Sequence, residues 1–191
     1  DILIEVVERM REEIIRLGGE FLFHSQVTDI LPKENCLIVN GCHRIETDAA
    51  VFAVGHSARD TFQMLFDRNV AMKSKSFAIG VRAEHRQDMI DEAMYGRKER
   101  GPLGAAAYKL TAQLENGRGV YTFCMCPGGY VVNASSEQGR LAVNGMSYHD
   151  RAGENANSAV IVTVTKDDYG SDHPLAGMEF QRRLEKKAWE E

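Results

Sequence analysis

An apolar run, Ala49-Ala50-Val51-Phe52-Ala53-Val54, leads directly into Gly55 and restricts the possible folds more than any other feature. A strand that is apolar at consecutive positions buries both of its faces, as strands do inside a layered α/β core. A glycine after such a strand lets a backbone or a ligand approach closely, because no Cβ blocks the way. The run therefore predicts a buried strand, followed either by a ligand site at its carboxyl end or by an ordinary turn.

The residues before this run predict a helix and a β-hairpin. Apolar residues recur at alternating steps of four and three over residues 3–17, which predicts an amphipathic helix that ends at Gly18-Gly19. A strand over 21–31 follows. Asn40-Gly41 is a strong hairpin signal, so we expect paired strands over 36–45 in which Val39 faces Cys42.

The pattern changes near residue 73, where alternation of apolar and polar residues becomes dominant. We expect strands over 76–84, 105–114, 120–126, 130–135 and 159–164, with helices over 87–94 and 176–189. The sequence thus predicts an α+β or mixed α/β chain, with one domain over 1–72 and a β-rich domain over 73–191.

Composition narrows the classes of function. Net charge is −5, from 23 Lys and Arg against 28 Asp and Glu, and a mildly acidic chain disfavours nucleic-acid binding. No apolar run is long enough to predict a membrane span. The four cysteines are predicted to be free thiols, which favours a cytoplasmic location. Because the chain lacks an initial Met and a signal peptide, we expect an internal part of a longer protein.

The segment after Gly55 carries the first candidate site. Ser57 is predicted to cap a helix over 58–67, and a helix N-terminus attracts anions. Arg59 would add positive charge to a phosphate site there. The alternative is an ordinary serine cap beside an exposed arginine, and spacing alone favours that alternative.

A second candidate site lies in the strand predicted over 76–84. Arg82 and Glu84 share the face opposite the apolar one, and His85 ends the strand. Such a group could bind a carboxylate substrate or transfer protons. The alternative is a solvated face that contains an ion pair.

The third candidate is the tract Cys124-Met125-Cys126-Pro127-Gly128-Gly129. Alternation predicts Thr122, Cys124 and Cys126 on one strand face, next to a tight turn whose backbone could approach a planar ligand. A cysteine there could be redox-active or nucleophilic if its thiolate is stabilised. Alternatively both cysteines are small buried hydrophobes. Two thiols without further ligands at suitable spacing do not predict a metal site.

Polar tracts over 133–137, 144–147 and 155–159 are rich in short amides and hydroxyls. Such side chains cap turns and also bind polar ligands. For each tract alone, turn chemistry is the favoured interpretation.

Together these motifs resemble a bacterial family of FAD-dependent dehydrogenases, described as NAD/FAD-utilising and mostly of unknown substrate. The matching tracts are Ala53–Thr61, Phe77–His85, Phe123–Gly129, Asn144–Ser147 and Asn155–Ala159. The resemblance implies a glutathione-reductase-like flavoprotein, with 1–72 as the later part of the FAD-binding domain and 73–191 as an inserted substrate domain. It also implies which residues lie near the FAD: Val27, Gly55, His56, Ser57, Gly128 and Gly129.

One feature of that family is missing here, because the chain contains no Gly-x-Gly-x-x-Gly fingerprint. We therefore expect FAD to be held by the whole protein and not by this chain alone, with NAD(P)H as a possible electron donor. The hypothesis is an FAD-dependent oxidoreductase of unidentified small-molecule substrate. Arg82, His85, Cys124 and Cys126 are its candidate catalytic residues, and the rest of the longer chain is its partner. The alternative is a non-catalytic ligand-binding module on a flavoprotein scaffold.

Overall fold

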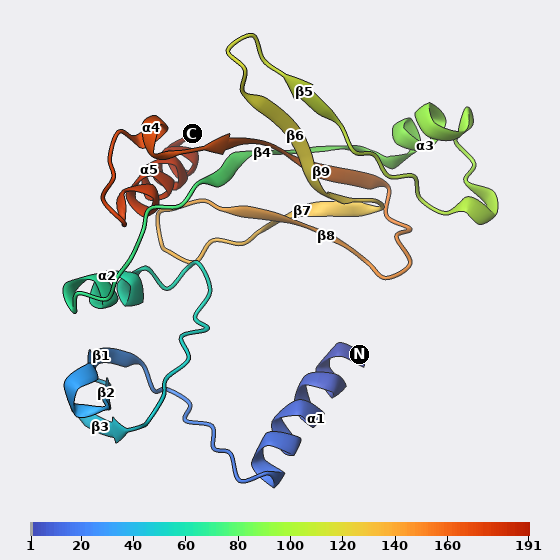
Figure 1. Ribbon diagram of the computed structural model, residues 1–191. Coiled ribbons are helices and arrows are strands. Elements are labelled where there is room, and N and C mark those ends of the chain that lie inside the picture. The colour runs from blue at the N-terminus through green and yellow to red at the C-terminus, as the bar shows by residue number, and fades with distance from the viewer. Residues whose placement is uncertain (1) are drawn as a thin grey trace. The chain divides into compact units, whose positions relative to one another are not determined.

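The computed structural model describes residues 2–191, which form two compact units over 2–70 and 71–191 (Figure 1). Both units combine helices with antiparallel strands, so the predicted α+β class is confirmed. No helix within the described residues is both long enough and apolar enough to cross a membrane.

The first unit is built around a three-stranded antiparallel sheet of order β1-β2-β3. Its elements are α1 (Ile2–Arg16), β1 (Val27–Leu31), η1 (Pro32–Glu34), β2 (Cys36–Val39), β3 (His43–Glu46) and α2 (Arg59–Asp67). Ile30, Cys36 and Val39 are buried and form a small core. Arg68, directly after α2, donates from Nε and Nη2, one edge of its guanidinium, to the carboxylate of Asp29 in β1, which ties this helix to the sheet.

The predicted helix and hairpin are confirmed, with one change of register. Gly18 ends α1 at a φ of +90°, in the left-handed region that glycine adopts without strain. Asn40 and Gly41 also have positive φ values. Val39 pairs with His43, however, and not with Cys42, so the connection holds three residues instead of two.

The strand predicted over 21–31 is correct only from Val27 onward. β2 ends at Val39, which pairs with Val27, so the residues before Val27 have no strand to pair with. The side chain of Asn40 holds them instead. Its Oδ1 accepts from Gln26 N at 2.9 Å, and its Nδ2 donates to His24 O at 3.0 Å.

The buried strand predicted over 49–54 is wrong for the chain as described. Residues 49–55 form no strand, and Val51 is 91% exposed. A strand with two apolar faces needs neighbouring strands and covering layers. The three strands of this unit pair only among themselves, so the apolar run has no partner within residues 2–70.

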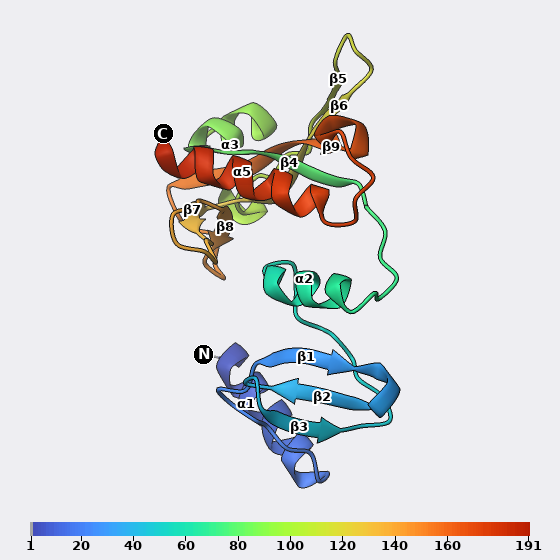
Figure 2. The same ribbon diagram turned by 90° about the vertical axis from the view of Figure 1, so that its left-hand side faces the viewer.

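The second unit contains a four-stranded antiparallel sheet of order β4-β9-β6-β5 and a separate β7-β8 hairpin. Its strands are β4 (Phe77–Arg86), β5 (Thr111–Gln113), β6 (Gly119–Cys126), β7 (Gly129–Asn133), β8 (Val143–Ser147) and β9 (Asn155–Val164). Its helices are α3 (Gln87–Tyr95), η2 (Gly101–Leu103), α4 (Lys166–Tyr169) and α5 (Ala176–Glu190). Figure 1 and Figure 2 show α5 next to the part of the sheet where β4 begins.

The two faces of the large sheet have different cover. Phe77 lies against Gly177 of α5 and stacks on Tyr169, so the helices cover the sheet near the start of β4. On the opposite face, Glu84 accepts a hydrogen bond from Val131 N of β7 at 2.6 Å. The β7-β8 hairpin therefore lies over the face that carries Arg82 and Glu84, because alternate residues of a strand share a face.

Two tracts expected as polar turns are strands. Residues 144–147 lie in β8, and residues 155–159 begin β9, the central strand that pairs with both β4 and β6. Asn157 and Ser158 are fully buried there. Amides and hydroxyls that favour turns in isolation are tolerated in this strand because the neighbouring strands satisfy the backbone.

Candidate functional site

A β-bulge in β6 determines where the two cysteines lie. Phe123 pairs with Ala159 and Cys126 pairs with Asn157, so β6 contains one extra residue. Cys124 lies in the bulge with a φ of +47°. Thr122 pairs with Val160, three residues from Asn157, so Thr122 and Cys126 point to opposite faces. The prediction that Cys126 shares a face with Thr122 is therefore wrong.

The bulge brings Cys126 to the face that carries Arg82. Nη1 of Arg82 lies 3.7 Å from Cys126 Sγ and donates to Cys124 O at 3.1 Å. It also donates to Asn157 Oδ1. We call Arg82, Cys124, Cys126 and Asn157 the Arg82 cluster. All three contacts of Arg82 are with neutral acceptors, and within residues 2–191 no carboxylate pairs with this guanidinium.

The Arg82 cluster is incompletely satisfied. Asn157 is fully buried, and among the described residues its Nδ2 has no hydrogen-bond partner. A buried polar group without a partner is uncommon and calls for a physical explanation. Gly145 of β8 covers the pair closely, because a Cβ there would come within 2.0 Å of Arg82 Nη1 and 2.1 Å of Asn157 Oδ1. Any side chain at position 145 would displace Arg82 or Asn157.

His85 lies on the other face of the sheet, away from the Arg82 cluster. Its partner in β9 is Ala156, three residues from the Ala159 that pairs with Arg82. His85 Nε2 lies 2.7 Å from the hydroxyl of Tyr108. Burial raises the pKa of Tyr108, and a hydrogen bond with Ser158 offsets part of that rise. The expected grouping of Arg82, Glu84 and His85 is thus wrong with respect to His85.

Glu84 shares the face of Arg82 but points to different partners. Its carboxylate accepts from Val131 N and from the Asn155 side chain, at 2.6 and 2.7 Å. The Val131 hydrogen bond, followed by that of Asn155, lowers the pKa of Glu84 below its usual value. These hydrogen bonds of Glu84 hold the β7-β8 hairpin on the sheet.

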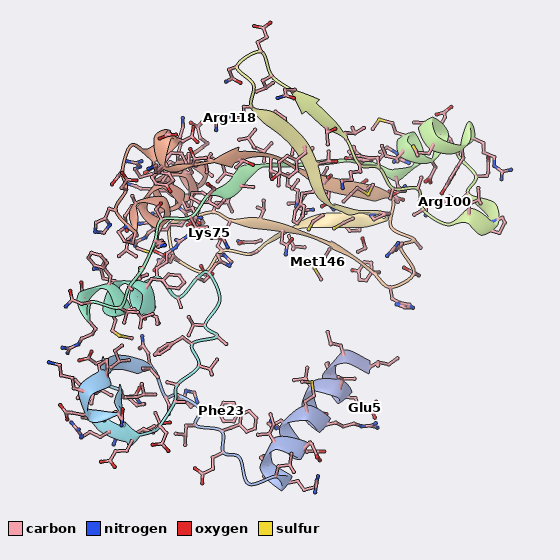
Figure 3. The ribbon with its side chains drawn as sticks, in the orientation of Figure 1. Glu5, Phe23, Lys75, Arg100, Arg118 and Met146 are labelled. Carbon is pink, nitrogen blue, oxygen red and sulfur yellow. The ribbon has the colours of Figure 1, made fainter. Side chains whose placement is uncertain are left out.

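A second polar group, which we call the Asp91 network, holds the Pro127-Gly128-Gly129 turn from α3. Gln87 Oε1 accepts from Gly128 N at 2.8 Å, and Gln87 Nε2 donates to Asp91 at 2.8 Å and to Ala106 O at 2.9 Å. Asp91 also accepts from Ala106 N at 2.9 Å and from Arg100 at 2.5 Å. Gln87 and Asp91 are fully buried. Figure 3 marks Arg100 in the loop beyond α3.

The two glycines of the turn are closely covered by backbone. Gly128 has a φ of +58°, and a Cβ on it would lie 2.0 Å from Arg151 O. A Cβ on Gly129 would lie 2.2 Å from Met146 O. Packing against these two segments accounts for both glycines. The turn therefore does not fit an open cradle for a flavin, and cofactor contacts by Gly128 and Gly129 stay a prediction.

The other residues predicted to lie near FAD belong to the first unit. Val27 is half-buried at the start of β1, and His56 is exposed. Gly55 has a φ of +72° and, like other turn glycines such as Gly41 and Gly117, no atom within 4 Å of its Cβ position. Its contact with the cofactor stays a prediction.

Ser57 does not cap α2 as expected. The helix begins at Arg59 with Ala58 as its N-cap, and the Ser57 hydroxyl lies 3.3 Å from His56 Nε2. Arg59 itself is buried, so the exposed arginine of the alternative interpretation is not observed either.

Sequence reasoning missed three residues that organise the second unit: Asn157, Gln87 and Asp91. Gln87 and Asp91 are four residues apart, the spacing that places side chains together on one helix face. Asn155 and Asn157 alternate with Ala156 and Ser158, which is the two-residue period of a strand. Both signals were present in the sequence, but neither indicates that the side chains are buried.

Two comparisons with known proteins produced matches. A family described as "FAD-dependent protein, C-terminal domain-like" matches residues 76–191, nearly the whole second unit. A protein of Clostridium beijerinckii, named "Uncharacterized protein", is 53% identical over 194 residues. That match covers 99% of this chain and 36% of the relative's length. Because the family match covers more than half of the residues, the chain belongs to the family of FAD-dependent protein C-terminal domains.

Proposed function

We propose that the chain is part of an FAD-dependent oxidoreductase in which residues 71–191 provide the substrate-binding surface. The observation that carries the proposal is the Arg82 cluster. It combines a guanidinium without a carboxylate partner, a thiol 3.7 Å from that guanidinium and a buried amide with an unsatisfied donor, within a family of FAD-dependent proteins.

The residues of the chain have separate roles in this proposal. When bound, FAD supplies the hydride-accepting chemistry. Gly55 offers an open backbone face for contact with the cofactor, next to His56. Arg82 orients the substrate through charge and hydrogen bonds, and its Nη1 lies 3.7 Å from Cys126 Sγ. Gln87 and Asp91 hold the turn that follows Cys126.

Cys124 and His85 have weaker support as catalytic residues. The Cys124 side chain is exposed, but its contact with Arg82 is through the backbone oxygen. His85 forms a hydrogen bond with Tyr108 on the opposite face of the sheet, so it could not transfer a proton to a ligand bound at Arg82.

The direct test is the flavin content of the full-length protein. We expect a purified sample to show the absorption spectrum of bound flavin, which bleaches on anaerobic reduction. Addition of NADH or NADPH under the same conditions tests whether a nicotinamide is the electron donor. A full-length protein that neither retains nor takes up FAD would contradict the proposal.

A non-catalytic binding module is the second candidate. It is favoured by the separation of His85 from Arg82, because the Arg82 cluster then contains no histidine to act as a general acid or base. Under this candidate the full-length protein binds FAD and small molecules, but none of the small molecules reoxidises or reduces the flavin. Flavin turnover with any bound small molecule would decide for the oxidoreductase.

A further inference from the structure

The guanidinium of Arg82 is fixed at one nitrogen and available at the other two. All of its contacts with described residues use Nη1, which donates to Cys124 O, Asn157 Oδ1 and Cys126 Sγ. Within residues 2–191, Nε and Nη2 have no such contact, and neither is a buried atom that lacks a partner. Solvent therefore reaches the Nε–Nη2 edge of a side chain whose position is already determined.

That edge has a defined chemical preference. The parallel N–H groups of an arginine fork match the two oxygens of a carboxylate, and such bidentate pairs are among the stronger charge-assisted hydrogen bonds. Two other arginines of the unit already have a carboxylate partner. Arg86, four residues along β4, donates to Asp88 from Nε and Nη2, and Arg100 donates to Asp91 from Nε. Arg82 differs from both because no carboxylate of the described residues meets it.

Asn157 provides the independent second observation. It is fully buried, its Oδ1 accepts from Arg82, and its Nδ2 has no partner among the described residues. Position 145 requires a glycine, because a Cβ there would collide with Nη1 of Arg82 and Oδ1 of Asn157. The arrangement keeps a cation oriented on a polar sheet face without neutralising it, which is a property of a ligand-binding site.

We infer that the Nε–Nη2 edge of Arg82 binds a carboxylate of the substrate, with Asn157 as a positioning residue that fixes the guanidinium. The inference rests on the proposed function only in identifying the bound carboxylic acid as the substrate. Binding of the carboxylate itself requires no flavin chemistry. The substrate class is thus a small carboxylic acid, bound on the sheet face that contains Cys126.

The test measures carboxylate affinity of the full-length protein, with FAD bound and after its removal. Acetate and succinate are titrated at constant ionic strength against chloride, and the shift of the thermal unfolding midpoint gives each dissociation constant. We expect Arg82→Met to lower the affinity for acetate and succinate by about tenfold or more, since it removes a charge-assisted pair. Arg82→Lys retains the charge but not the fork, so its affinity should lie between those of the wild type and Arg82→Met.

Two further variants make the result specific. Arg86→Met is the matched control, because Arg86 lies on the same strand and already has a carboxylate partner, and it is expected to leave the affinity unchanged. Asn157→Asp places a carboxylate of the same size as the native amide next to Arg82. This carboxylate should compete with the ligand, so we expect weaker carboxylate binding. The variant also provides a test if Arg82→Met does not fold.

The outcomes separate this inference from the proposed function. Equal affinities in wild type, Arg82→Met and Asn157→Asp would overturn the carboxylate site, whether or not flavin is bound. Arg82-dependent binding of phosphate that is tighter than that of acetate and succinate would overturn the carboxylate assignment. Absence of flavin would contradict the proposed function but would leave Arg82-dependent carboxylate binding measurable.

Discussion

The Asp91 network and the Arg82 cluster contact the same short tract, residues 124–128, yet they differ in completeness. In the network, Asp91 accepts from a backbone amide, an amide side chain and a guanidinium. In the cluster, the guanidinium has only neutral partners and a buried amide nitrogen has none. A fully satisfied buried network rigidifies a fold, whereas the Arg82 cluster, with its unsatisfied donor, is the place where we propose that a ligand binds. Substitutions in the Asp91 network should therefore lower the free energy of unfolding, and substitutions in the Arg82 cluster should lower the affinity for ligands.

The largest effect is expected for Asp91→Ala. It leaves Ala106 N, Gln87 and Arg100 without their acceptor in a fully buried position, so the free energy of unfolding should fall by about 4 kcal/mol. Urea denaturation of the full-length protein measures the change. Asp88→Ala, on the same helix, removes only an exposed ion pair and should cost less than about 1 kcal/mol. Similar losses of unfolding free energy in Asp91→Ala and Asp88→Ala would contradict the structural role assigned to the Asp91 network.

The next effect concerns the Gly128 turn that the network holds. Gly128→Ala combines a left-handed φ with a collision against Arg151 O, and should cost about 3 kcal/mol. Gly117→Ala is the matched control, because Gly117 also has a positive φ but open space around its Cβ position. It should cost about 1 kcal/mol. The difference between the two variants in chemical denaturation isolates the close backbone approach, and equal values would argue against it.

A smaller effect should appear in the pH dependence of stability. Burial raises the pKa of Asp91, but hydrogen bonds from Ala106, Gln87 and Arg100 outweigh burial and lower it overall. The unfolded state then binds the proton more readily than the folded state. The contribution is complete above the ordinary aspartate pKa of about 4, and is lost as pH falls through the lowered folded value.

Asp91→Asn lacks this titration and serves as the comparison. The stability difference between wild type and Asp91→Asn should be constant above pH about 4 and should narrow below it. Urea titrations across this range measure the difference. A gap that narrows as pH rises would contradict the assigned direction of the pKa shift.

The smallest effect on stability is expected from Arg82→Met. Its guanidinium is only partly buried and bonds to neutral groups, so the loss should be about 1 kcal/mol despite the reduced carboxylate affinity. Chemical denaturation without added carboxylate provides the measurement. A loss as large as that of Asp91→Ala would indicate that Arg82 belongs to the structural framework and not to a binding site.

Local patterns in the sequence predicted several elements correctly. The periodicity over 3–17 gave α1, Asn40-Gly41 gave the hairpin, and alternation gave β4 and β6. Gly18 and Gly41 have the positive φ values that their turns require. These features depend on neighbours within a few residues, so propensity and spacing suffice to predict them.

Elements that need distant partners were predicted less well. Residues 49–54 have the composition of a buried strand but no strand to pair with in residues 2–70. Asn155 and Asn157 have the composition of a turn, yet both pair with β4, and Asn157 also pairs with β6. In each case the available pairing decided the structure against local preference.

The sequence by itself determined which chemical groups are present near the Cys124–Gly129 tract: an arginine, two thiols and a glycine turn. Only the tertiary structure decided which of them meet. The β6 bulge reverses the face of Cys126, and the antiparallel register places Arg82 against residues 42, 44 and 75 positions away. A one-residue shift in register moves every side chain to the opposite face. Long-range pairing, rather than composition, therefore joined Arg82 to Cys126 and separated it from His85.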